Sequence, residues 1–126
     1  MVVLDTAALL YWTLDPERLP EQVAVAIASA DRVLVSSISV WEIGLKVKRG
    51  RLHLPVSVRE FAERLRGVAR VEVLGVDELL WIENLELPWA HEDPADRTVV
   101  ALAQRMGCPL VTPDAAIGAF YPMTVW

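Results

Sequence analysis

Short runs of β-branched and other apolar residues alternate along the chain with longer segments in which apolar residues recur every three to four positions. The short runs predict strands. These strands lie over Met1–Leu4, Arg32–Ser36, Val71–Leu74 and Pro109–Val111, with a short edge strand over Met123–Val125.

The longer segments predict helices between these strands, in pairs. They cover Ala7–Trp12, Pro20–Ala30, Val40–Arg49, Ser57–Val68, Asp77–Leu85 and Pro94–Met106. Strands that alternate with helices are typical of an α/β domain built on a parallel sheet. We therefore expect a three-layer α/β/α sandwich around a central, mostly parallel sheet of four to five strands.

Cap residues sharpen several of these boundaries. Asp93 and Pro94 begin the last long helix with an N-cap and a proline at the first position, and Gly107 ends it. Ser39-x-x-Glu42 and Ser57-x-x-Glu60 both have the form of a capping box, in which the two side chains satisfy free backbone amides. The first of these boxes follows a predicted strand, whereas the second does not.

Length and composition limit the class of protein. A chain of 126 residues with 54% hydrophobic and 23% charged residues is long enough for one core and is not disordered. Without repeats or a linker, residues 1–126 are expected to form a single domain. The longest uncharged run, Ala115–Trp126, contains Gly118 and Pro122 and is shorter than the roughly 18 to 20 residues of a membrane span. A basic leader is also missing, so we expect a cytoplasmic protein.

The mean hydropathy of +0.35 is nevertheless high. Either the core is unusually well filled, or part of the surface is covered by a partner or a second copy, and we favour the interface. Trp41 and Trp81 lie in amphipathic segments and are expected to pack inside. Cys108 precedes an apolar stretch and is expected to be buried and unreactive.

The net charge of −5 argues mildly against a nucleic-acid partner, but the charges are segregated. Lys46, Lys48, Arg49 and Arg51 form one basic cluster at a predicted helix end. This cluster suits contacts with an RNA backbone, and it equally suits a solvated helix end that basic residues stabilise.

Acidic residues recur near the carboxyl ends of the predicted strands, which meet at one edge of a parallel sheet. Asp5 follows the first strand, Glu42 lies in the first turn after the second, Asp96 opens the helix before the fourth, and Asp114 follows the fourth. Ligands of open parallel sheets bind beyond the carboxyl ends of the strands. Each acid alone is explained as a cap or a turn residue. Their shared placement is not.

Carboxylates gathered at one edge require a counter-charge. Two carboxylates about 4 Å apart repel by roughly 4 kcal/mol at an effective dielectric of 20. An oxygen-only site suits Mg²⁺ or Mn²⁺, whereas zinc prefers Cys and His, and His53 and His91 are isolated in the sequence. The pattern therefore favours metal-assisted phosphate chemistry.

Four segments in order resemble PIN domains, and most closely the VapC-type toxins of toxin–antitoxin systems. The segments are Val2–Thr6, Ser36–Ile43, His91–Arg97 and Val111–Asp114. The resemblance implies an acidic pocket that binds one or two divalent cations, Mg²⁺ or Mn²⁺, and endonucleolytic hydrolysis of RNA by a metal-activated water. It also implies a homodimer and a cognate antitoxin that covers the active-site groove.

The resemblance also assigns roles to single residues. Asp5, Glu42 and Asp96 match the three core acidic residues, which are both catalytic and metal-binding, and Asp114 matches a fourth, more variable one. Further polar positions match groups that hydrogen-bond the carboxylates or metal-bound water. These are Thr6, Ser37 and Thr112, with Asp93 either beside them or acting only as an N-cap.

Arg97 has two interpretations at this stage. It either points inward, toward the leaving oxygen and the RNA backbone, or forms a surface ion pair with Asp93 or Glu92. Ala95 stands where relatives often carry an aromatic residue, a difference that does not touch the chemistry.

Three other functions are alternatives to the nuclease. A response-regulator receiver requires an acidic pair before its first helix, and here Asp5 stands alone. A haloacid-type phosphatase requires a second Asp two residues after the first, where this chain has Ala7. The remaining alternative is a catalytically silent PIN-like module that binds RNA or protein. Loss of an acidic ligand would mark such a module, and all four acids are present, so we favour the nuclease.

Overall fold

The computed structural model describes all residues, 1–126, and its centre is a five-stranded sheet in which every neighbouring pair of strands is parallel. The strand order is β3-β2-β1-β4-β5. The strands are β1 (Val2–Leu4), β2 (Val33–Ser36), β3 (Val71–Leu74), β4 (Leu110–Val111) and β5 (Thr124–Val125). The predicted strands, including the short edge strand, are confirmed.

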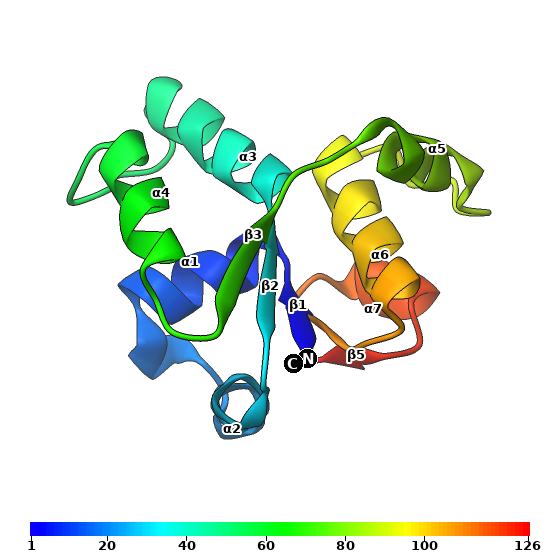
Figure 1. Cartoon of the computed structure of the whole chain (residues 1–126), viewed down its shortest axis with the longest axis horizontal. Helices are drawn as coiled ribbons and strands as arrows, with labels where there is room; N and C mark the ends of the chain where they lie inside the picture. Colours follow the sequence, from blue (N-terminus) through cyan, green and yellow to red (C-terminus); the bar gives the residue numbers. More distant parts are fainter.

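Two layers of helices cover this sheet (Figure 1). The first layer contains α1 (Thr6–Leu14), α2 (Glu21–Ser29), α3 (Ser37–Lys48) and α4 (Val58–Arg66), with a 3₁₀ helix at Pro16–Arg18. The second layer contains α5 (Glu78–Glu86), α6 (Pro94–Met106) and α7 (Ala115–Phe120). The predicted three-layer α/β/α class is therefore confirmed.

Alternate residues of each central strand supply the two halves of the core. Leu4 and Val35 pack with the helices of the first layer, whereas Val3, Leu34 and Leu110 pack with those of the second. Because both faces of the sheet are covered at its centre, β1, the first three residues of β2, and β4 are continuous apolar runs without polar alternation. This is why the strands were recognisable as short uninterrupted runs.

The start of α3 differs from the prediction. Ser36 ends β2 and also caps the helix, since its hydroxyl accepts a hydrogen bond from the amide of Ile38 (3.3 Å). The predicted capping box at Ser39 and Glu42 is therefore wrong. Ser39 lies fully buried inside the helix, where its hydroxyl accepts a hydrogen bond from Thr6 (3.0 Å).

The chain after β4 also differs. Asp114, whose structural alternative to a site role was a turn after Pro113, is the N-cap of α7, a helix of six residues that the short, glycine-containing segment did not reveal. By contrast, the caps of α6 are confirmed: Asp93 Oδ1 accepts the amide of Asp96 (2.9 Å), and Gly107 has the left-handed φ of 62° that favours glycine.

The longest helix, α6, has 13 residues. None of the helices combines the length and the apolar character that a membrane crossing requires.

Candidate active site

Asp5 lies at the centre of the carboxyl edge of the sheet, directly after β1. Its side chain is 4% exposed. Oδ1 accepts a hydrogen bond from the amide of Ala8 (2.7 Å), which makes Asp5 the N-cap of α1, and Oδ2 accepts one from the hydroxyl of Thr112. Both oxygens of this carboxylate are thus held in fixed directions by neighbouring elements.

The surroundings of Asp5 disfavour its negative charge. Burial away from water is the largest effect and raises the pKa of Asp5 to about 6, and the charges of Asp96 and Asp114 act in the same direction. The hydrogen bonds from Thr112 and Ala8 act against this increase in pKa. A cation at this edge would relieve the repulsion and favour the ionised carboxylate.

Asp114 is placed through the same threonine. Thr112 directly follows β4, and its hydroxyl, which donates to Asp5, accepts a hydrogen bond from the amide of Asp114 (3.0 Å). Asp114 Oδ1 accepts the amides of Ala116 (2.8 Å) and Ile117 (3.1 Å). Its Oδ2 has no hydrogen-bond partner in the chain, so this oxygen is available to a ligand.

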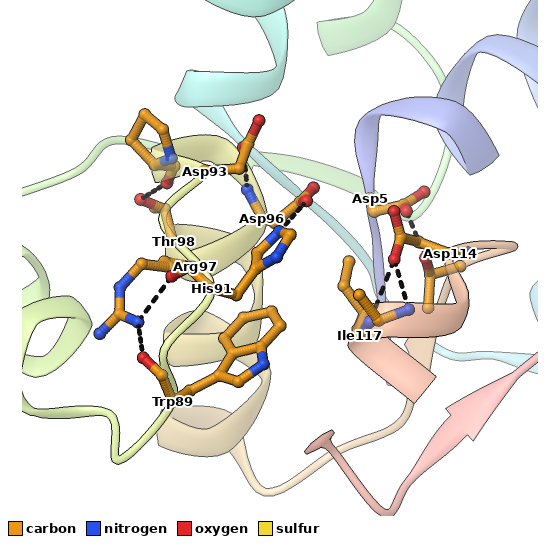
Figure 2. Close-up of polar contacts among 12 residues, drawn as sticks. Asp5, Trp89, His91, Asp93, Asp96, Arg97, Thr98, Asp114 and Ile117 are labelled. Atoms are coloured by element: carbon orange, nitrogen blue, oxygen red, sulfur yellow. Dashed lines mark hydrogen bonds and ion pairs between the residues drawn. The ribbon is translucent and has the colours of Figure 1, made fainter. Parts of the chain in front are cut away.

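Asp96 comes to the site from α6. Figure 2 shows its carboxylate facing the space that Asp5 and Asp114 also face. Burial raises the pKa of Asp96, and the charges of Asp93 and Asp114 raise it further. Oδ2 contacts the imidazole of His91 (2.7 Å), and Oδ1 has no partner in the chain. Three of the four predicted acids, Asp5, Asp96 and Asp114, therefore lie close enough together that charge repulsion raises the pKa of Asp5 and of Asp96.

Glu42 stands apart from these three. It is partly buried on α3 and forms no hydrogen bond or salt bridge with another carboxylate. Because α3 begins at Ser37, Glu42 lies in the second turn of this helix, whereas the prediction put it in the first turn.

The chemical type of the candidate ligands suits a hard divalent cation, because every one of them is a carboxylate oxygen. No three Asp, Glu, His or Cys side chains lie close enough to hold one ion together. Mg²⁺ usually keeps several waters and takes only one or two carboxylates from the protein. The free oxygens of Asp96 and Asp114 suit that mode of binding.

The predicted supporting residues have different surroundings. Thr112 contacts Asp5, and Asp93 caps α6. Thr6 donates its hydroxyl hydrogen to Ser39 and so links α1 to α3 beside Asp5. Ser37 lines an apolar pocket with Trp41 and does not contact a carboxylate.

Both interpretations of Arg97 are wrong. Its guanidinium forms no ion pair and donates to the carbonyls of Asn84, Leu87, Trp89 and His91 and to the Asn84 side chain. An arginine has five N–H donors, and all five are used within the chain. No donor remains for a phosphate or for Asp93, so Arg97 organises the loop between α5 and α6.

His91 belongs to no Cys/His group in the sequence, but in the fold it contacts an acid of the site. Besides its contact with Asp96, the imidazole stacks on Trp89, with ring centroids 4.5 Å apart. Its five-residue separation from Asp96 resembles no standard motif. Only the path of the loop before α6 brings the two side chains together.

The basic cluster lies on the first layer of helices. Lys46, Lys48, Arg49 and Arg51 are exposed at the C-terminal end of α3 and form no salt bridge. Since α3 begins at the carboxyl end of β2 and has 12 residues, the cluster begins about 15 Å along the helix from that edge.

Comparisons with known proteins agree with this fold. Residues 2–121 match the PIN domain family, so the chain belongs to that family. Among individual relatives, it is 30% identical over 129 aligned residues to Ribonuclease VapC22 of Mycobacterium tuberculosis, an alignment that covers 99% of this chain and 98% of the relative. The predicted resemblance to VapC-type PIN domains is thereby confirmed.

Solved structures share the fold at lower identity. A toxin–antitoxin complex from Klebsiella pneumoniae superposes with a TM-score of 0.69 at 15% identity and covers 100% of this chain and 97% of its own. FitAcB from Neisseria gonorrhoeae gives 0.64 at 22% identity, with 100% and 96% covered. A structure of FitAB bound to a DNA fragment gives 0.64 at 21% identity, with 100% and 94% covered.

Proposed function

We propose that this chain is a divalent-metal-dependent endoribonuclease and the toxin of a toxin–antitoxin pair, with residues 1–126 acting as one nuclease domain. The observation that carries the proposal is the buried Asp5, whose pKa is raised to about 6 beside the charges of Asp96 and Asp114. A buried carboxylate among other carboxylates is the arrangement that a cation stabilises. RNA as the substrate is supported by the 30% identity with a protein named as a ribonuclease.

In this proposal Asp5, Asp96, Asp114 and Glu42 bind Mg²⁺ or Mn²⁺ partly through water, because no three of these side chains lie close enough to contact one ion directly. A bound divalent cation supplies an acidified water and stabilises the negative charge that develops on a phosphate. The residues of the chain orient the site. The amide of Ala8 and the hydroxyl of Thr112 fix the two oxygens of Asp5, while Asp96 and Asp114 each keep one oxygen free.

The substrate backbone would be held by charge. Lys46, Lys48, Arg49 and Arg51 are exposed and unpaired, and contacts with phosphates are largely independent of sequence. A single-stranded segment that crosses from the acidic edge along α3 would reach these residues. Arg97 is excluded from this role, because its donors are all engaged.

The proposed partners are a cognate antitoxin and a second copy of the chain. A toxin–antitoxin complex among the structures of the same fold supports the antitoxin. The second copy is supported by apolar side chains left in solvent. Trp41 on α3 and Trp81 on α5 were expected to be buried, but they are 59% and 43% exposed and line the same pocket, and Leu85 on α5 is 78% exposed.

The direct test is cleavage of a mixed cellular RNA pool by the purified, antitoxin-free chain with Mg²⁺ or Mn²⁺. We expect cleavage that EDTA abolishes, that Asp96→Asn removes, and that Asp31→Asn, a change at an exposed aspartate, leaves intact. A folded wild-type chain that binds RNA but cuts none with either metal would favour the silent binding module instead.

A further inference from the structure

The loop before α6 presents an imidazole to one of the acidic residues. His91 Nε2 lies 2.7 Å from Asp96 Oδ2. An ionised carboxylate can only accept hydrogen bonds, so Nε2 carries the hydrogen in this contact. The contact occupies Oδ2 and leaves Oδ1 of Asp96 without a partner in the chain.

The imidazole ring is held by a column of aromatic rings. Trp89 stacks on His91, with ring centroids 4.5 Å apart and an interplanar angle of 20°, and also on Phe120, at 4.8 Å and 10°. Phe120 belongs to α7, the helix that Asp114 caps. The column therefore ties the position of the imidazole to the helix that carries another acid of the site.

The backbone of the same loop is held by Arg97. Its Nη1 donates to the carbonyls of Trp89 (2.5 Å) and His91 (2.9 Å), and Figure 2 shows the guanidinium on the side of the loop away from Asp96. His91 is thus fixed through both its ring and its backbone. The His91–Asp96 pair is partly exposed, with 28% and 24% side-chain exposure.

We infer that His91 is a positioning residue that acts through Asp96. Its Nε2–H holds the carboxylate so that Oδ1 faces the space shared with Asp5 and Asp114, where the divalent cation of the proposed function would bind. This inference rests on that proposed function. Removing the hydrogen-bond partner of a metal ligand typically weakens metal affinity about 10- to 100-fold.

Two substitutions at His91 separate the effect of its N–H donor from the effect of its stacked ring. His91→Phe keeps a flat ring that can stack on Trp89 but has no donor. His91→Gln loses the ring but keeps an N–H at a similar distance from the backbone. His53→Phe, at the other, exposed histidine of the chain, is the matched control.

The measurement is Mn²⁺ affinity of the metal-stripped proteins by isothermal titration calorimetry, with the thermal midpoint in EDTA as a check on folding. We expect His91→Phe to bind Mn²⁺ about 10- to 100-fold more weakly than wild type. His91→Gln should stay within about threefold and His53→Phe unchanged. For RNA cleavage, His91→Phe should lower kcat and leave KM nearly unaltered.

The inference is overturned if folded His91→Phe binds Mn²⁺ as wild type does, or if His91→Gln is as weak as His91→Phe. A wild-type chain that binds no Mn²⁺ would instead remove the proposed metal-dependent function, and the inference with it. If His91→Phe does not fold, long-range ¹H–¹⁵N NMR of the wild-type histidines decides. A hydrogen on Nε2 of His91 supports the inference, and a bare Nε2 overturns it.

Discussion

The hydroxyl of Thr112 joins two acids of the site, because it donates to Asp5 and accepts from the amide of Asp114. Thr112 and Asp5 directly follow two neighbouring parallel strands, β4 and β1, so this contact is set by the register of the sheet. One side chain therefore fixes both the direction of the Asp5 carboxylate and the start of α7.

Replacing Thr112 with Val tests this relationship at nearly constant volume. The change removes a donor from a buried carboxylate and an acceptor from an amide, and we expect a loss of about 1–3 kcal/mol of stability at neutral pH. Since the Thr112 hydrogen bond lowers the pKa of Asp5, that pKa should rise further. Urea unfolding and ¹³C NMR of the Asp5 carboxyl measure the two effects. Thr112→Ser should behave nearly as wild type, and an unchanged Asp5 pKa in Thr112→Val would contradict the assignment.

The raised pKa of Asp5 makes a signed prediction about pH. The folded chain holds this proton up to about pH 6, whereas the ordinary value is 3.8. Between these values the folded state binds more protons than the unfolded state, so stability falls as the pH rises through this window. At about 1.4 kcal/mol per pKa unit, the ionised Asp5 costs the metal-free fold about 3 kcal/mol above pH 6.

Asp5→Asn removes that cost. In EDTA at pH 7.5 the variant should be about 1–3 kcal/mol more stable than wild type, and the difference should shrink toward pH 4. Asp31→Asn is the control, and it should change stability in the opposite direction. The terminal amine lowers the pKa of Asp31, so the ionised Asp31 stabilises the fold and its loss should lower stability at neutral pH. Urea unfolding at several pH values checks both. A wild type that gains stability between pH 4 and 6 relative to Asp5→Asn would contradict the burial effect.

Arg97 makes a prediction about stability. Arg97→Lys keeps the charge but loses the planar group that reaches four carbonyls and the Asn84 side chain. Carbonyls left partly buried without donors should lower the free energy of unfolding by about 2–4 kcal/mol. Arg105→Lys, at an exposed pair with Glu83, should cost at most about 1 kcal/mol. Equal effects in thermal unfolding of the two variants would argue against this role of Arg97.

The sequence was most informative where structure is local. Apolar runs identified the strands, and the caps at Asp93 and Gly107 identified α6, because each signal lies within a few residues of the element it defines. Asp5 and Asp114 were predicted for a similar reason, since Asp5 directly follows β1 and Asp114 lies just beyond the end of β4. Glu42 was predicted in the wrong turn of α3 because the start of this helix was predicted three residues too late, which is nearly a full turn.

Contacts that depend on the path of a loop could not be predicted. His91 and Arg97 are close to Asp96 in sequence, but nothing in their spacing indicates that one holds its carboxylate and the other the loop carbonyls. Trp41 and Trp81 were misplaced for a different reason. Amphipathic spacing shows that a helix has an apolar face, but it does not tell whether that face meets the core or another molecule.

The basic cluster makes a prediction about RNA affinity, which can be measured with Asp96→Asn so that the RNA stays intact. Replacing Lys46, Lys48, Arg49 and Arg51 with Gln should weaken binding similarly for unrelated sequences. Each lost phosphate contact should reduce the slope of log affinity against log salt by about 0.7 for a single strand. Arg59, Arg64 and Arg66 on α4 provide a control set on a different helix. An unchanged salt slope after the first set of substitutions would leave that cluster as a solvated helix end.

The exposed apolar residues of α3 and α5 make the last prediction, which concerns the proposed homodimer. Trp81→Glu and Leu85→Glu each place a charge on a surface that a second copy would cover, where burying an unpaired charge is costly. Light scattering after size exclusion should show a dimer for wild type and a monomer for both variants, with the thermal midpoint largely retained. Val25 on α2, in the opposite helical layer, is 58% exposed, so Val25→Glu should leave the dimer intact. A dimer that survives both α5 substitutions would move the interface to another face, and a wild-type monomer would leave the apolar surface to the antitoxin.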